Sequence, residues 1–168
     1  MRESKQADRN KLWDLIRKEH TALLVTVEAD GSLDARPMGC VQRAFDGTLW
    51  FLTFRHSEKL REIAHDSQVL ISYARPSDYH YVAVTGRARM IEDMAKLKEL
   101  WREGFRVWFP SGPDDPEVAL LQVTVSRARY WTRPASILTY AWAYIRARTT
   151  GQAARAKEIA ETHTIELE

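Results

Sequence analysis

The sequence predicts an α+β fold in which an antiparallel β-barrel carries helices on its outside. At least six segments have the residue pattern of strands, and Asp-Gly turns join the first three of them. Such short turns connect antiparallel neighbours, and a run of them forms a meander. Helical patterns lie between only some of the strands, so the alternating strand–helix order of a doubly wound parallel sheet is missing.

The N-terminal part predicts a helix followed by three strands. Residues 8–19 place Leu12, Leu15 and Ile16 on one helical face. Turns are expected at Asp30-Gly31 and Asp46-Gly47. The strands they separate are 22–27, 33–43 and 48–54. In the middle strand the side chains alternate, so that Arg36 and Met38 share one side and Pro37 lies on the other.

The remainder predicts two capped helices, three further strands and a C-terminal extension. Ser57 and Asp93 are expected to cap the helices. The expected strands are 69–73, 79–90 and 118–125, the last continuing toward Trp131, with a bulge or close backbone approach at Gly86. Residues 105–116 are expected to form a loop, 138–148 a helix or an aromatic loop, 152–162 a helix, and 164–168 a loose tail or short strand.

The composition limits the class of protein. The 168 residues fit one domain, 1–168, with a core of about 8–133 and a C-terminal extension of 134–168. One cysteine rules out a disulfide framework, which favours a reducing compartment, here the cytoplasm. No apolar run is long enough to span a membrane, and the polar N-terminus does not resemble a signal peptide. Six tryptophans are unusual, and some of them suit the wall of a site for a flat ligand.

Charge is unevenly distributed along the chain. Residues 118–157 carry seven Lys and Arg and no Asp or Glu, so the net charge of +2 leaves −5 on the rest. A segment of one sign can meet an anion, or it can be a solvated face that pairs with acidic residues of the same fold or of a second subunit. The total charge is too small to indicate nucleic acid, which is an unlikely partner.

Common catalytic and cofactor motifs are absent. There is no GxGxxG and no GxxxxGK[ST]. None of the five histidines lies in HExxH, and Cys40 has no CxxC partner, so no metal site is expected. Cys40 fits a small buried side chain, although a Cys–His nucleophile pair stays open. No residue stands out as catalytic.

One group of residues indicates a phosphorylated ligand. Ser57 and Lys59 stand where a strand passes into a helix, and the free N–H groups of a helix N-terminus favour an anion. Arg36 lies on the neighbouring strand, where its guanidinium can reach the same phosphate, and Thr53 offers a hydroxyl. The alternative is a capped helix beside a salt-bridged arginine.

The order of these motifs resembles a known family. Arg-Pro-Met at 36–38, Asp-Gly-Thr-Leu-Trp-Phe-Leu-Thr at 46–53 and Ser-Glu-Lys-Leu-Arg-Glu-Ile at 57–63 resemble the FMN-binding split barrel of pyridoxamine 5′-phosphate oxidase-like proteins. A helix ending in Trp101, the segment Trp-Phe-Pro-Ser-Gly-Pro-Asp-Asp-Pro at 108–116 and the late pair Tyr130-Trp131 are similar to its general stress protein branch. The resemblance covers residues 8–133 and implies a six-stranded split barrel.

The resemblance also implies FMN at a homodimer interface, in a site built by both subunits. Arg36, Ser57 and Lys59 match its phosphate-binding positions. Met38 matches a backbone contact to the isoalloxazine, Leu52 and Thr53 match strand positions that touch the flavin, and Trp131 matches a nearby aromatic. Trp108 and Trp101 are candidates to line the flavin site from the partner subunit. The implied cofactor-binding set is Arg36, Pro37, Met38, Leu52, Thr53, Ser57, Lys59, Trp108 and Trp131.

Departures from the oxidase pattern narrow the activity. Glu58 replaces a basic phosphate ligand, which implies a weaker grip or compensation from Arg55 or the basic segment. Val41 replaces a lysine that holds substrate phosphate, and the Arg-x-His substrate motif is missing. We therefore expect an FMN-dependent oxidoreductase on an unknown small molecule, and not a pyridoxamine 5′-phosphate oxidase proper. The alternatives are a non-catalytic flavin-sequestering stress protein and a deazaflavin- or haem-binding relative. The sequence identifies neither the substrate nor the electron donor.

Overall fold

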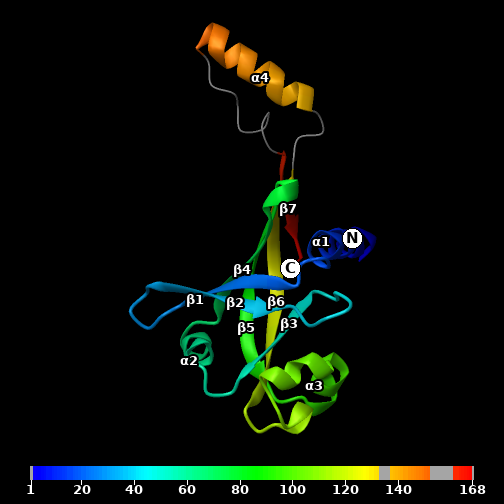
Figure 1. Ribbon diagram of the computed structural model, residues 1–168, viewed down its shortest axis with the longest axis vertical. Coiled ribbons are helices and arrows are strands. Elements are labelled where there is room, and N and C mark those ends of the chain that lie inside the picture. Colours follow the sequence, from blue (N-terminus) through cyan, green and yellow to red (C-terminus); the bar gives the residue numbers. More distant parts are fainter. Residues whose placement is uncertain (1, 133–136, 152–160, 168) are drawn as a thin grey trace.

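A curled antiparallel sheet forms the body of the molecule (Figure 1). The computed structural model describes residues 2–132, 137–151 and 161–167. The strand order is β2-β1-β4-β5-β6-β3, with β7 paired to β6, and β2 and β3 meet where the half-barrel closes. The strands are β1 (Thr21–Val27), β2 (Leu33–Gly39), β3 (Thr48–Phe54), β4 (Gln68–Arg75), β5 (His80–Ile91), β6 (Val118–Thr132) and β7 (Glu161–Glu166). The predicted α+β split barrel is confirmed.

Helices surround the barrel, and one stands away from it (Figure 1). The helices are α1 (Arg2–Ile16), α2 (Glu58–His65), α3 (Met94–Leu100) and α4 (Ile137–Thr150), with short 3-10 turns η1 (Pro76–Asp78), η2 (Glu103–Val107) and η3 (Gly112–Asp114). α4 projects beyond the end of β6, and β7 returns from that side to pair with β6. None of the helices in the described ranges is long and apolar enough to cross a membrane.

Side chains that alternate between the two faces of a strand place apolar residues in the core. In β1 the side chains of Ala22, Leu24 and Thr26 are buried inside the barrel, whereas those between them face outward. Leu12, Leu15 and Ile16 of α1 pack on the same core, which confirms the predicted apolar helical face. The inward-facing row of β1 therefore holds one polar side chain, Thr26, among apolar ones.

The outer side of β3 is buried by α3 and the turns that follow it. Trp50 and Val41 pack with Leu100 and Leu120, and Lys96 lies 5.5 Å from the centre of the Trp50 ring. This cover explains why the β3 sequence is apolar on both faces, unlike the half-exposed β1 and β2.

Two local predictions are confirmed at their residues. The register between β5 and β6 shifts at Gly86, and a Cβ there would lie 2.2 Å from the backbone oxygen of Thr124, so only glycine fits. The Asp93 side chain accepts a hydrogen bond from the Lys96 amide at 2.9 Å, as an N-cap does.

Several boundaries differ from the prediction. α1 begins at Arg2 and ends at Ile16, β2 ends at Gly39, and η2 and η3 lie in the expected loop. α4 is a helix, one of the two expected alternatives. Glu161 and Thr162, expected in a helix, pair with β6 in β7, because its edge offers unpaired backbone groups. The rest of that expected helix, 152–160, lies outside the described residues.

Candidate functional site

The junction between β3 and α2 gathers three of the predicted residues. Ser57 occupies the N-cap position of α2, yet its hydroxyl caps no backbone N–H. That hydroxyl lies 3.5 Å from Thr53 Oγ1, and Lys59 Nζ donates to the same oxygen at 3.0 Å. Thr53 is buried, so the three side chains form a fixed polar corner at the start of the helix. The Ser57 hydroxyl thus has this long contact with Thr53 and no capping role.

Arg36 approaches the same helix from β2, held by a network that joins three elements. Its Nη1 donates to Thr26 Oγ1, and its Nη2 donates to Asp34 and, at 2.8 Å, to Glu62 Oε2. The Thr26 hydroxyl in turn donates to Glu62. The side chains of Arg36 and Glu62 are 16% and 13% exposed, so this is a largely desolvated ion pair.

The charges of this site act on one another. Burial lowers the pKa of Lys59 below its usual 10.5, and the positive charge of Arg36 lowers it further. The hydrogen bond from Arg36 lowers the pKa of the Asp34 carboxyl. Arg36 and Lys59 are thus electrostatically coupled, and Lys59 in turn contacts Thr53.

The acidic residue at position 58 is exposed beside this group. Glu58 is strongly exposed and lies 3.5 Å from Arg61, one turn along α2. Arg55, expected as a compensating cation, instead pairs with Glu92 at 2.6 Å and donates to the Pro116 carbonyl at 3.1 Å. Arg55 therefore fastens the loop before β6 and is not free for a phosphate.

The described cations of the basic segment are divided between β6 and α4. Arg129 lies 5.5 Å from the centre of the Trp131 ring, and Arg127 is opposite Glu166 in the β6–β7 register. Arg133, Arg155 and Lys157 lie outside the described residues. The described part of the segment thus supplies no cation to the corner at Lys59.

The residues expected around the isoalloxazine are divided between the two faces of the barrel wall. Pro37 is exposed on the outer face of β2, whereas the side chain of Met38 is buried in the core. Leu52 is half-buried on the outer side of β3, where Trp101 and Val118 pack. The Met38 side chain is therefore part of the core, and only its backbone is available to a ligand.

Two predicted tryptophans lie apart. Trp108 is 65% exposed and follows η2, next to Phe109, whose ring centre is 4.9 Å from that of Phe54 at the end of β3. Trp131 is at the other end of β6 from the Lys59 corner. Thr53 of that corner pairs with Ala119 of β6, and Trp131 is twelve residues beyond Ala119, which is about 40 Å along the strand. One chain does not bring Trp131 to the Lys59 corner.

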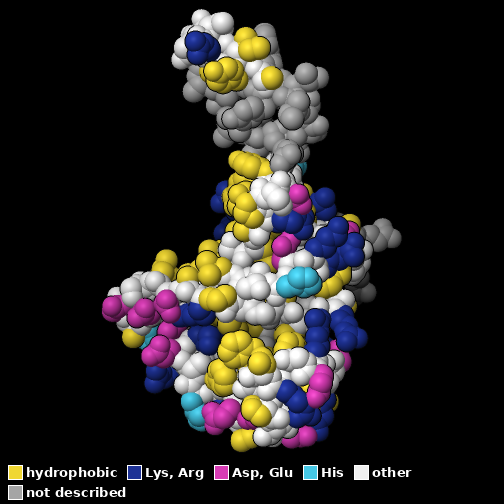
Figure 2. Space-filling model, viewed as in Figure 1, with side chains coloured by type: hydrophobic (Ala, Val, Ile, Leu, Met, Phe, Trp, Pro, Cys, Tyr) yellow, Lys and Arg dark blue, Asp and Glu magenta, His cyan; other side chains and the backbone are white. Residues whose placement is uncertain are grey.

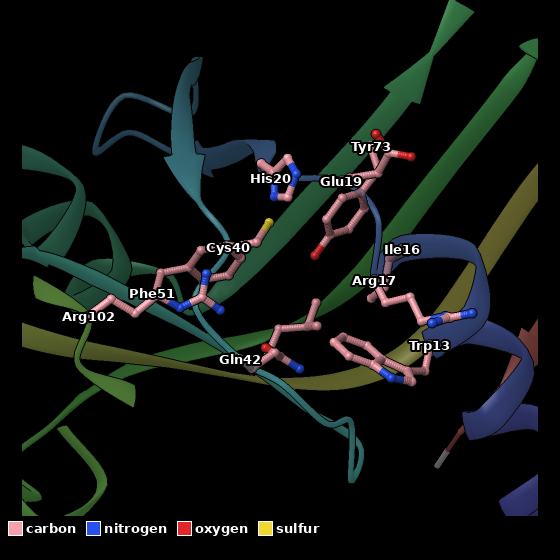
Figure 3. A pocket seen from close by; sticks show the side chains of 11 residues that line it. Trp13, Ile16, Arg17, Glu19, His20, Cys40, Gln42, Phe51, Tyr73 and Arg102 are labelled. Carbon is pink, nitrogen blue, oxygen red and sulfur yellow. The ribbon is translucent and has the colours of Figure 1, made fainter. Parts of the chain in front are cut away.

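Cys40 lies in a separate small cavity at the α1 end of the barrel (Figure 3). The cavity has a volume of about 100 Å³, and Tyr73, His20 and Arg102 line it with the thiol. Burial raises the pKa of the Cys40 thiol to about 11, and the pKa of the buried Tyr73 is raised as well. The site is too small for an organic ligand and its thiol too weak an acid to serve as a nucleophile, which favours the structural role for Cys40.

Sequence reasoning missed Thr26 and Glu62. A signal existed for each: Thr26 is the polar residue in the inward row of β1, and Glu62 is three residues after Lys59, on the same helical face. Within the described ranges no group of three or more His, Cys, Asp and Glu is placed to hold a metal ion, so a metal-centred reading gains no support there.

The fold defines the chain as a split-barrel protein, with a polar corner of Thr53, Ser57 and Lys59 at the β3–α2 junction. The family model for "Pyridoxamine 5′-phosphate oxidase like" proteins matches residues 7–155, and the chain belongs to this family. The resemblance stated from the motifs is thereby confirmed.

Solved structures show the same fold. General stress protein 26 from Bacillus anthracis is 25% identical, with 73% of this chain and 92% of that chain covered and a TM-score of 0.65. The general stress FMN/FAD binding protein from Xanthomonas citri is 23% identical (79% and 93% covered, TM-score 0.66). A protein related to general stress protein 26 from Clostridium acetobutylicum is 16% identical (76% and 89% covered, TM-score 0.66). No curated protein matches the chain.

Proposed function

We propose that this protein binds FMN and that the Arg36–Lys59 corner holds the phosphate. The observation that supports this most strongly is that Lys59 and Ser57 meet at the buried Thr53, while Arg36 of β2 lies close enough for its charge to act on Lys59. Two cations and a hydroxyl that caps no helix are the donors a phosphate monoester uses. The similarity to an FMN/FAD binding protein from Xanthomonas citri supports the same reading.

The residues present fit the cofactor in chemical type. Lys59 is partly desolvated and has a lowered pKa, so an anion beside it would restore its preference for the charged form. Pro37, the Met38 backbone and Leu52 offer apolar and peptide surface for the isoalloxazine, since the polar donors lie at the α2 end. Bound flavin supplies acceptance and release of electrons, and the chain supplies binding and orientation.

We propose further that a second copy completes the site. The outer face of β1 and β2 exposes apolar side chains, among them Leu23 at 43% and Leu33 at 70%, beside the exposed Pro37. Figure 2 shows hydrophobic side chains along part of this hairpin, with acidic side chains at its end. Such a patch is typical of an interface. A homodimer would also let Trp131 and Trp108 of one subunit approach the corner of the other.

The proposed chemistry is that of a flavin-dependent oxidoreductase that is not a pyridoxamine 5′-phosphate oxidase proper. Val41, at the position of the substrate-phosphate lysine in the oxidase, is 2% exposed and packs with Trp50 and Leu120. A side chain buried among apolar groups binds no phosphate, so the substrate differs. The cytoplasm is the proposed compartment, because the thiol of Cys40 is unpaired.

The test is to titrate the purified chain with FMN and, separately, with riboflavin, and to monitor binding by flavin fluorescence. Light scattering then gives the mass of the particle and so its oligomeric state. We expect one FMN per chain, weaker binding of riboflavin, and a dimer. Equal affinity for the two flavins would contradict the phosphate assignment. Stopped-flow reduction of the FMN complex by NADH or NADPH then separates an enzyme from a sequestering protein, since reduction no faster than that of free FMN would oppose turnover.

A further inference from the structure

The guanidinium of Arg36 is already occupied by carboxylates in this structure. Nη2 donates to both Asp34 and Glu62, and Nη1 donates to Thr26. An arginine grips an oxyanion with two parallel N–H bonds through either its Nη1–Nη2 edge or its Nε–Nη2 edge. Both edges include Nη2, so neither fork is open to a phosphate while these bonds persist.

The local charge balance opposes a dianion as well. Arg36 and Lys59 face Asp34 and Glu62 within the network, and the groove beside α2 is lined by further carboxylates. That groove has a volume of about 330 Å³ and its lining is Glu28, Ala29, Asp34, Glu58, Arg61, Glu62 and His65. An FMN phosphate, with about two negative charges at pH 7, would enter next to the Glu62 carboxylate.

We propose that Glu62 is a specificity-determining residue of the flavin site: by holding Arg36 Nη2, it reduces the preference for a flavin that carries a phosphate over one that does not. This inference rests on the proposed function. Glu62 acts on the ligand through Arg36 and Thr26 and by its charge. Thr26 fixes its orientation, because the buried hydroxyl accepts from Arg36 and donates to Glu62.

The experiment compares FMN and riboflavin affinities in Glu62→Gln and in the unaltered chain. Glutamine keeps the shape and one oxygen that accepts from Arg36, but it removes the negative charge. We expect FMN to bind on the order of tenfold more tightly and riboflavin to change less than about twofold. Asp34→Asn should shift the ratio in the same direction by less, because its carboxyl is 48% exposed.

Glu19→Gln is the matched control. Glu19 is 12% exposed and pairs with Arg75 at 2.6 Å, so it loses the same charge from a similarly buried ion pair at the Cys40 end of the barrel. Its ratio of FMN to riboflavin affinity should equal that of the unaltered chain. A Glu62→Gln ratio that stays the same or falls, in a chain that binds FMN, would overturn this inference alone. Failure of the unaltered chain to bind either flavin would overturn the proposed function, and this inference with it.

Discussion

Replacing Lys59 with methionine separates the two roles of that side chain. Lys59 Nζ gives one N–H to Thr53 at 3.0 Å, which leaves two donors and a full charge for a phosphate. A charge-assisted contact of this kind contributes on the order of 1–3 kcal/mol, so FMN affinity should fall by a factor of about 5–150, while riboflavin affinity stays the same. Arg36→Ala should also weaken FMN binding, because it removes a cation and leaves the Glu62 carboxylate without its ion pair.

The stability of the unliganded chain should respond in the opposite direction. Burial and the charge of Arg36 disfavour the Lys59 cation in the fold, so an apolar side chain of similar length removes that cost. Fluorescence titration gives the two affinities, and thermal unfolding without flavin should show an unchanged or raised Tm for Lys59→Met. Equal losses for FMN and riboflavin, or a large fall in Tm, would refute the reasoning, since Lys59 would then be a structural residue and not a phosphate ligand.

Three other predictions test separate parts of the structure. Gly86→Ala places a Cβ 2.2 Å from the Thr124 oxygen, so it should lower the free energy of unfolding by about 3 kcal/mol and the Tm by roughly 6–12 °C. Gly104→Ala, whose Cβ would meet nothing within 4 Å, should leave the Tm unchanged. Equal Tm values for the two variants would contradict the close approach at Gly86. Burial raises the pKa of the Cys40 thiol from 9.0 to about 11, so it should react with iodoacetamide at pH 8 about 100-fold more slowly in the folded chain than after denaturation. Faster alkylation of the folded chain would place the thiol in a more open setting. The pKa of Lys59 lies below 10.5, so as the pH rises Lys59 loses its charge at a lower pH than an ordinary lysine does. FMN affinity should therefore begin to fall below pH 10.5, while riboflavin affinity stays level. A parallel decline of both affinities would assign the effect to unfolding.

Much of the fold is predictable because local patterns and tertiary packing agree. Alternation, Asp-Gly turns and helix caps locate the first three strands and α2 and α3, whose residues are close in sequence. The C-terminal part is different. Thr162 and Glu161 carry no local signal that outweighs a helical pattern, and they become a strand only because β6 extends far enough to pair with them. That pairing depends on long-range contacts, which sequence periodicity does not contain.

The sequence indicates the cations of the candidate site more directly than its acidic residues. Arg36, Ser57 and Lys59 stand out through their positions at a strand and a helix start. The role of Glu62 depends on how α2 packs against β1, which places its carboxylate on Thr26 and Arg36. The same packing turns Glu58 toward solvent and Arg55 toward Glu92, so the compensation expected from Arg55 is not what the structure shows.

The most direct test of the central claim is the identity of the ligand that co-purifies with the chain, from its visible absorption spectrum and its mass after release. We expect the spectrum of an oxidised flavin and the mass of FMN, with about one FMN per chain and a smaller amount bound to the Lys59→Met variant. A deazaflavin, a haem, or a flavin retained equally by the Lys59→Met and unaltered chains would contradict it.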